Sequence, residues 1–176
     1  TGVAEVPFGT TIREIVYGIG GGIPKGKKLK AVHFGGPMGG CIPASLIDTP
    51  LDFDELAKLG APIGAGSMRV IDEDNSMVDI ARYFLDFLSN ESCGKCVPCR
   101  EGIRRMVRIL KRICNGKGRE GDIALLEEIA EVTGEASLCA LGKTAADPLL
   151  STLRYFRDEY QANIERMKRP AEKRES

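Results

Sequence analysis

Three cysteines follow one another at two-residue gaps near the middle of the chain. They are Cys93, Cys96 and Cys99, within residues 91–102. Three thiolates at this spacing can bind three of the irons of a cubane iron–sulfur cluster from a single loop. The fourth iron then needs a ligand from a distant segment. This constrains the fold, because the chain has to return to the loop with another cysteine, and Cys139 is the candidate.

The chain has six cysteines, an even number that could also indicate disulfides. The sequence contains no secretory segment, and 176 residues are enough for a hydrophobic core without disulfides. Metal or redox chemistry is therefore the preferred interpretation. Cys41, which follows two glycines, and Cys114, at the end of an apolar helix face, are expected to be small buried hydrophobic residues.

Zinc is the main alternative metal, because four cysteines can also form a structural zinc site. Such sites usually take two ligands from each of two turns. In this chain three cysteines come from one loop and one from another, with no histidine nearby. The spacing favours an iron–sulfur cluster, and a zinc-stabilised interaction module remains the alternative.

Residues 1–74 read as a small mixed domain of short strands and helices. A proline at position 43 indicates an edge strand. Short strands around one helix predict a ubiquitin-like β-grasp domain, truncated at its N-terminus. We expect strands at 3–6, 28–34, 41–47 and 68–72, and helices at 11–17 and 52–59.

Residues 75–168 change to helical apolar spacing, which predicts a four-helix bundle and an α+β chain overall. The expected helices begin at residues 76, 98, 122 and 147, and the third ends at Gly134. Residues 169–176 are expected to form a disordered tail. In an up-down-up-down bundle the first and third links lie at the same end, so Cys139 can reach the cysteine loop.

Basic residues flank the cysteines in the sequence, and they suit a negatively charged cluster. Those nearest to the cysteines are Lys95, Arg100 and Lys143. Pro98 fits the first turn of the following helix, whose N-terminus adds free N–H donors. Positive charge and hydrogen bonds around the sulfurs should raise the reduction potential.

Several functional classes are disfavoured. The formal net charge is zero, which argues against non-specific nucleic-acid binding. No run of 18 apolar residues is present, so no membrane span is expected, and we expect a cytoplasmic location or a peripheral one through partner subunits. The only histidine, His33, lies in an apolar strand pattern and is expected to be structural.

The chain begins without a methionine, inside an expected strand, so we expect it to be a piece of a longer protein.

The cysteine motif resembles a known family. Residues 91–102 read ESCGKCVPCREG and residues 137–142 read SLCALG, which is similar to the NADH-binding flavoprotein subunit of NADH:quinone oxidoreductase (complex I). GPMGGCIP at 36–43 and LLSTLRYFRDEY at 149–160 look closest to the NAD(P)-linked iron hydrogenase members.

The resemblance implies a soluble-ligand-binding β-grasp domain followed by a helical domain with one 4Fe–4S cluster. It also implies that Cys93, Cys96, Cys99 and Cys139 are the ligands. In such subunits FMN accepts a hydride from NADH, and the cluster takes electrons from the flavin one at a time. The implied partners are an upstream FMN- and NADH-binding domain and other iron–sulfur subunits of a multi-subunit oxidoreductase.

The flavin and nicotinamide sites of that family lie in an upstream glycine-rich domain, which this sequence lacks. The glycines at 20–22 and 35–40 do not match a dinucleotide-binding fingerprint and are expected to form turns. We therefore expect no FMN or NAD site in the chain, and no NADH oxidation by the chain alone.

Overall fold

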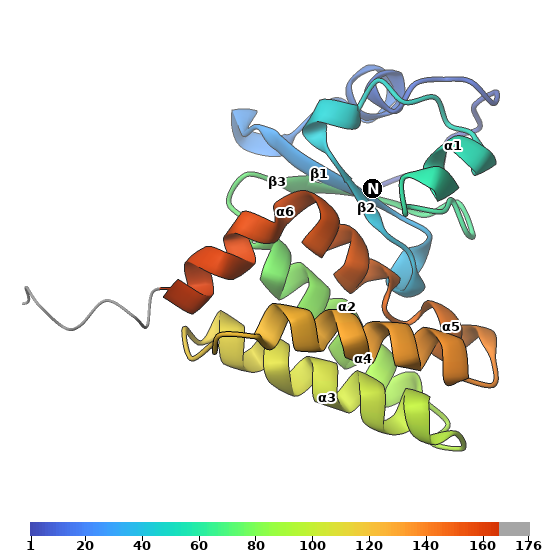
Figure 1. Ribbon diagram of the computed structural model, residues 1–176. Coiled ribbons are helices and arrows are strands. Elements are labelled where there is room, and N and C mark those ends of the chain that lie inside the picture. Colours follow the sequence, from blue (N-terminus) through green and yellow to red (C-terminus); the bar gives the residue numbers. More distant parts are fainter. Residues whose placement is uncertain (166–176) are drawn as a thin grey trace, which may run out of the picture.

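The computed structural model describes residues 1–165 and shows a three-stranded antiparallel sheet beside a layer of helices (Figure 1). The strands are β1 (Leu29–Phe34), β2 (Cys41–Pro43) and β3 (Met68–Asp72), in the order β2-β1-β3. Val32 in the central strand pairs with Ile42 on one side and Val70 on the other. Strand β2 with Pro43 is an edge strand, as predicted from the proline.

The two faces of the sheet pack against different parts of the chain, because alternate side chains of β1 point to opposite faces. Val32 and Phe34 join the core formed with Ile12 and Leu56. That core lies beneath the π-helical turn η1 (Glu14–Ile19) and helix α1 (Phe53–Lys58). The opposite face, which includes Ala31 and Cys41, packs against α2 (Met77–Glu91) and α6 (Asp147–Glu165). The shorter 3-10 turns are η2 (Pro24–Gly26), η3 (Gly36–Met38) and η4 (Ala44–Leu46).

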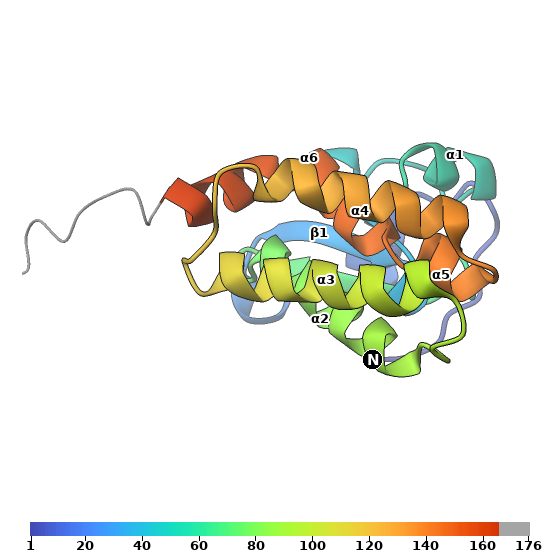
Figure 2. The same cartoon turned by 60° about the horizontal axis from the view of Figure 1, so that its bottom comes forward.

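Four long helices share one hydrophobic core. They are α2, α3 (Val97–Cys114), α4 (Asp122–Ala136) and α6, and a short helix α5 (Ala140–Thr144) lies between α4 and α6. Figure 2 shows α3 and α4 running side by side. Leu85, Ile103, Leu110 and Leu149 are buried where these helices meet. Within residues 1–165, no helix has both the length and the apolar character needed to cross a membrane.

Several local signals in the sequence produce the expected caps. The side chain of Glu14 accepts hydrogen bonds from the Thr11 amide (2.8 Å) and hydroxyl (2.7 Å), and the Glu14 amide donates back to that hydroxyl (3.2 Å). This reciprocal pair confirms the capping box. The Asp52 side chain caps α1, and the Ser76 hydroxyl accepts from the Asp79 amide (3.4 Å) at the start of α2.

The structure corrects the predicted N-terminal strand and the length of β2. Residues 3–6 form no strand, and Val3 is fully exposed, because the sheet offers this segment no pairing partner. Strand β2 ends at Pro43 instead of continuing to residue 47. Pro43 has no N–H to continue the ladder, and η4 follows it directly.

The third long helix also differs from the prediction at both ends. Gly121, with φ of +85°, is its N-cap, and Asp122 is its first residue. The helix passes through Gly134 to Ala136. Its packing against α3 and α5 maintains the helix, although glycine is a weak helix former. Helix α5 was not predicted.

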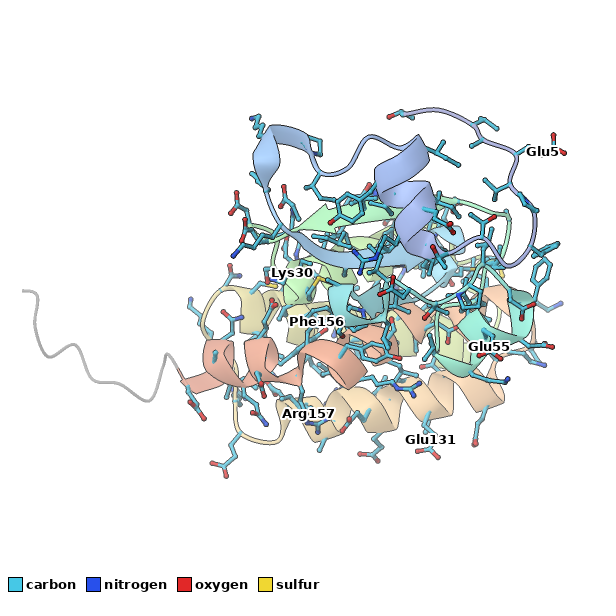
Figure 3. The ribbon with its side chains drawn as sticks, turned by 90° about the horizontal axis from the view of Figure 1, so that it is seen from above. Glu5, Lys30, Glu55, Glu131, Phe156 and Arg157 are labelled. Carbon is cyan, nitrogen blue, oxygen red and sulfur yellow. The ribbon has the colours of Figure 1, made fainter. Side chains whose placement is uncertain are left out.

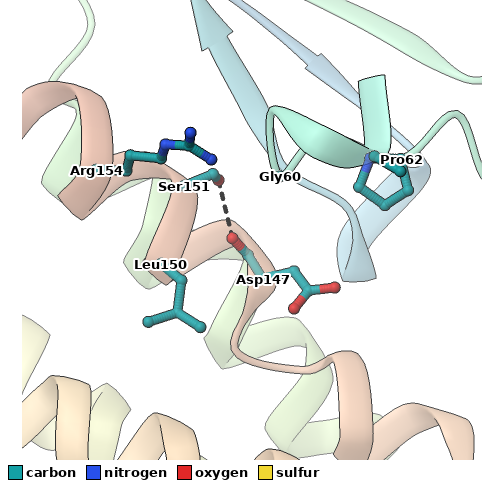
Figure 4. Close-up of a pocket in the computed structure, with 7 residues that line it drawn as sticks. Gly60, Pro62, Asp147, Leu150, Ser151 and Arg154 are labelled. Atoms are coloured by element: carbon teal, nitrogen blue, oxygen red, sulfur yellow. Dashed lines mark hydrogen bonds between the residues drawn. The ribbon is translucent and has the colours of Figure 1, made fainter. Parts of the chain in front are cut away.

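Helix α6 joins the sheet to the helical layer. The Ser151 hydroxyl accepts a hydrogen bond from the Cys41 amide (3.0 Å) and donates one to the Asp147 carbonyl (2.8 Å; Figure 4). The Tyr155 hydroxyl donates to the Leu59 carbonyl (2.9 Å). At Phe156, labelled in Figure 3, the backbone leaves helical geometry (φ −134°, ψ 32°). The Phe156 side chain packs against the sheet face that carries Ala31 and Cys41. The predicted end of the helical domain at residue 168 and the tail 169–176 lie outside the described residues.

Candidate metal centre

The four predicted ligand cysteines lie at one end of the helical layer. Cys93 follows the end of α2, Cys96 is the N-cap of α3, and Cys99 lies in the first turn of α3. Cys139 is the N-cap of α5. The beginnings of α3 and α5 lie at the same end in both Figure 1 and Figure 2. Gly94, with φ of +76°, makes the tight turn between α2 and α3 possible.

The segment around Cys139 packs directly on the cysteine loop. A Cβ placed on Gly142 would lie 3.0 Å from the Cβ of Cys99 and 2.5 Å from the Cβ of Ser137. Cys99 is 4% exposed, Cys96 is half-buried, and Cys93 and Cys139 are exposed. One thiol therefore lies in the core of the helical layer while two face solvent.

Polar groups from both segments act on the thiols. A backbone hydrogen bond from Leu138 is the main cause that lowers the pKa of Cys96, and the Cys99 backbone and the Ser137 hydroxyl act in the same direction. Burial raises the pKa of Cys99, although a contact of 3.3 Å with the Ser92 hydroxyl opposes this effect. Charge on each of the other three cysteines also raises the pKa of Cys99, so the Cys99 thiol interacts electrostatically with all of them.

These donors suit a bound iron–sulfur cluster. The buried Ser137 hydroxyl has no fully formed hydrogen bond among the described residues, and it lies beside Cys96 and Cys99. Backbone N–H groups and hydroxyls next to thiolates are the usual hydrogen-bond donors around cluster sulfurs. The set of four thiols, these donors and the N-terminus of α3 fits a 4Fe–4S cluster.

The arrangement gives no support to a single zinc ion. Over residues 1–165, no three Cys, His, Asp or Glu side chains gather in the arrangement that one metal ion requires. A cubane cluster offers four separate irons, so its cysteine ligands need not converge on one point.

The flanking residues have different roles in the structure. Arg100 donates a hydrogen bond to the Gly94 carbonyl (2.5 Å), and this bond stabilises the cysteine loop. Arg100 also pairs with its neighbour Glu101 (3.1 Å). Pro98 occupies the first turn of α3, as predicted. Lys95 and Lys143 are exposed to solvent near the cysteines.

Three residues of this centre were missed by the sequence analysis. Ser92 and Ser137 stand one and two residues before a cysteine, and that proximity was an available signal. Gly142 gave no comparable signal, because its role depends on contact with the first turn of α3.

The other candidates lie away from the centre. Cys41 is fully buried, and burial raises the pKa of its thiol to about 11. Cys114 packs at the edge of the helical core, where burial also raises its pKa. His33 is 2% exposed, as expected for a structural residue. Residues 35–40, four of them glycines, form a tight turn around η3, and Gly35 has a φ of +77°.

Comparison with known proteins agrees with the cysteine motif. Residues 79–163 match the family described as NADH-ubiquinone oxidoreductase-F iron-sulfur binding region. The chain is 45% identical over 170 residues to the NADP-reducing hydrogenase subunit HndC of Solidesulfovibrio fructosivorans, covering 97% of this chain and 35% of that protein. It is 37% identical over 164 residues to the F subunit of the NADH-quinone oxidoreductase of Escherichia coli (strain K12), covering 93% of this chain and 37% of that protein.

A solved structure has a similar fold. An NAD+-reducing [NiFe]-hydrogenase in the H2-reduced state superimposes with a TM-score of 0.78 at 27% identity, over 95% of this chain and 27% of the other. The chain thus spans little more than a third of the length of the curated relatives it matches. The predicted resemblance is confirmed: residues 79–163 are an iron–sulfur binding region of the NADH-ubiquinone oxidoreductase-F family, whose cofactor is a 4Fe–4S cluster.

Proposed function

We propose that the chain is the electron-transfer module of an NADH-oxidising flavin and iron–sulfur oxidoreductase. The observation that supports this best is the packing of residues 137–142 on the cysteine loop, with Gly142 against Cys99. A 4Fe–4S cluster, when bound, accepts and releases one electron at a time. The module would relay electrons from FMN, carried by another domain of the same protein, to iron–sulfur partner subunits.

Cys93, Cys96, Cys99 and Cys139 would be the thiolate ligands. The Leu138 backbone and the Ser137 hydroxyl favour negative charge at Cys96, which suits a deprotonated ligand. Arg100 holds the backbone of the loop in place through the Gly94 carbonyl. The exposed side chains of Lys95 and Lys143 would add positive charge, and together these groups would raise the reduction potential of the bound cluster.

We also propose the finer fold description: a β-grasp domain over residues 1–74 and a four-helix iron–sulfur domain over residues 75–168. The first would dock against the FMN domain and neighbouring subunits, and the second would hold the cluster. With the FMN and NADH sites elsewhere in the protein, the chain alone should not oxidise NADH.

The test is metal analysis of the anaerobically reconstituted protein. We expect iron and acid-labile sulfide at cluster stoichiometry, and an electron paramagnetic resonance signal on reduction. Cys139→Ser should lose most of the iron and sulfide. Cys114→Ser is the matched control, because Cys114 lies at the opposite end of α3, and this variant should keep both.

Two outcomes would count against the proposal. One is a well-folded protein that holds neither iron nor sulfide after reconstitution. The other is stoichiometric zinc with no cluster absorption after anaerobic purification, which would favour the zinc-stabilised interaction module.

A further inference from the structure

The outer surface of α3 and α4 carries two stripes of opposite charge. In Figure 1 these helices form the side of the molecule that faces away from the sheet, and Figure 2 shows them side by side. The basic stripe consists of three exposed arginines of α3, Arg104, Arg105 and Arg108. The acidic stripe consists of three exposed glutamates of α4, Glu128, Glu131 and Glu135.

The charges of the two stripes are not neutralised within the described chain. None of the six side chains forms an ion pair within residues 1–165. Residues three or four apart on a helix are neighbours, so each stripe places like charges next to one another, which destabilises a helix. Glu135 also lies in the last turn of α4, where the helix dipole disfavours a negative charge. A surface of opposite charge outside the chain would offset this repulsion.

The two stripes lie at the same level along the helices. A short turn joins α3 to α4, so the two helices are antiparallel, and a Cβ placed on Gly102 would meet the Thr133 side chain. From this shared level, Arg104 is two residues along α3 and Glu131 is two residues back along α4, about 3 Å in each case at 1.5 Å per residue. Each stripe has a further residue one turn onward in the same direction, so the match extends over two turns.

Pairing of this surface with a copy of itself fits two-fold symmetry, the commonest symmetry of protein dimers. A two-fold axis parallel to the helices places α3 of one copy over α4 of the other without changing the level along the helices. The basic stripe of each copy then faces the acidic stripe of the other, and the same contact forms twice. Val132, which is 54% exposed on α4 between Glu131 and Glu135, would be covered by the same contact.

We infer that the outer surface of α3 and α4 is an interface between two copies of this protein, related by a two-fold axis parallel to these helices. The basic stripe of one copy pairs with the acidic stripe of its partner. The charge complementarity of the two stripes and their common level select a second copy as the occupant of this surface. This inference does not depend on the proposed electron-transfer function.

The first test is sedimentation velocity of the natural full-length protein over a range of protein concentrations. We expect a dimer at low ionic strength. Salt screens exposed ion pairs, so the dissociation constant of the dimer should rise about tenfold or more between about 50 mM and about 500 mM sodium chloride.

Charge reversal then locates the interface. One variant combines Arg105→Glu with Arg108→Glu, and the other combines Glu128→Arg with Glu131→Arg. Each should dimerise about tenfold or more weakly than the natural protein, because like charges then face each other. The two variants mixed in equal amounts should recover the dimer, because both halves of the contact again join opposite charges.

The matched control combines Asp54→Arg with Asp158→Arg. It changes the net charge by the same amount as reversal of the two glutamates, at exposed positions of α1 and α6 that lie outside both stripes. The control should dimerise as the natural protein does, which separates pairing of the stripes from an effect of net charge.

Four results would overturn the inference. They are a natural protein that stays monomeric at low salt, a dimer that is equally stable at both salt concentrations, a dimer that either charge-reversed variant keeps, and no recovery when the two variants are mixed. A monomer whose stripes bind a different protein belongs to the first of these. The salt series uses the unaltered protein, so it remains decisive if a variant fails to fold.

Discussion

Gly142 of α5 contacts Cys99 of α3 so closely that a single added methyl group would lie 3.0 Å from the Cys99 Cβ. The same methyl group would lie 2.3 Å from the Ser137 hydroxyl. The two segments that carry the cysteines therefore meet through a residue without a side chain. Their spacing depends on that glycine, although it provides no ligand atom.

Gly142→Ala should reduce cluster occupancy while the protein remains folded. The added methyl group would push α5 away from α3, and a displacement of about 1 Å is enough for the cysteine ligands to bind a cluster poorly. We expect iron per chain after reconstitution to fall to about half or less. Gly134→Ala is the control, because its nearest contact would be an ordinary 3.4 Å from the Lys143 carbonyl. Equal iron content in the two variants would show that the contact does not control the site.

Asp122→Ala should be strongly destabilising. Asp122 is 3% exposed, pairs with the Arg112 guanidinium through two hydrogen bonds, and accepts from the Arg119 amide (2.8 Å). Its removal leaves a partly buried guanidinium without its carboxylate, at a cost of about 2–4 kcal/mol in the free energy of unfolding. Urea denaturation would measure this loss.

A second ion pair provides the comparison. Arg157, labelled in Figure 3, meets Glu127 of α4 at 2.7 Å with both side chains nearly half exposed. Glu127→Ala should lower the free energy of unfolding by less than about 1 kcal/mol, because water already screens the pair. A similar loss from both substitutions would contradict the role assigned to burial at Asp122.

The protein should lose stability as the pH falls because of His33. Burial lowers the pKa of its imidazole from 6.5 to about 4, so the unfolded chain takes up a proton before the folded one does. The stabilising contribution is present above pH 6.5 and decreases as the pH falls toward 4, by up to about 3 kcal/mol. His33→Phe should flatten the stability curve over that range, measured by denaturation at successive pH values. A parallel curve for the variant would be inconsistent with a neutral buried ring.

Asp147 should make the stability of the protein depend on pH in the opposite direction. Burial in the cavity shown in Figure 4 raises the pKa of its carboxyl from 3.8 to about 6, although Arg154 lines the same cavity. The folded state therefore binds the proton more tightly, and the ionised carboxylate lowers stability above pH 6. Asp147→Asn should stabilise the protein by about 1–2 kcal/mol near pH 8, with the gain gone near pH 4. A constant difference across this pH range would rule out titration of Asp147 as the cause.

The sequence predicted those features of the fold that depend on local patterns. The Thr11 and Glu14 capping box and the start of α2 at Ser76 each involve residues within a few positions of one another. The edge position of Pro43 could be predicted from the proline alone, because it has no N–H to pair with a second neighbouring strand. The cysteine spacing also indicated the correct family, because ligand spacing in one loop is a local property. The ligand assignment itself stays a prediction.

The sequence could not predict features that depend on distant partners. Residues 3–6 have strand composition but find no neighbouring strand in the sheet. Gly134 looks like a helix end, yet packing against α3 and α5 carries α4 past it. The contact of Gly142 with Cys99 joins positions more than forty residues apart, and no spacing rule covers it.

The hydrogen bond from the Cys41 amide to Ser151 also bears on the order of events during synthesis. Chains emerge from the ribosome N-terminus first, so β1, β2 and β3 are available long before α6. Until α6 has been synthesised, the Cys41 amide lacks its partner, and the sheet face that carries Ala31, Cys41 and Ile71 lacks the contact with Phe156. The first half of this chain can therefore complete its fold only after α6 has been synthesised.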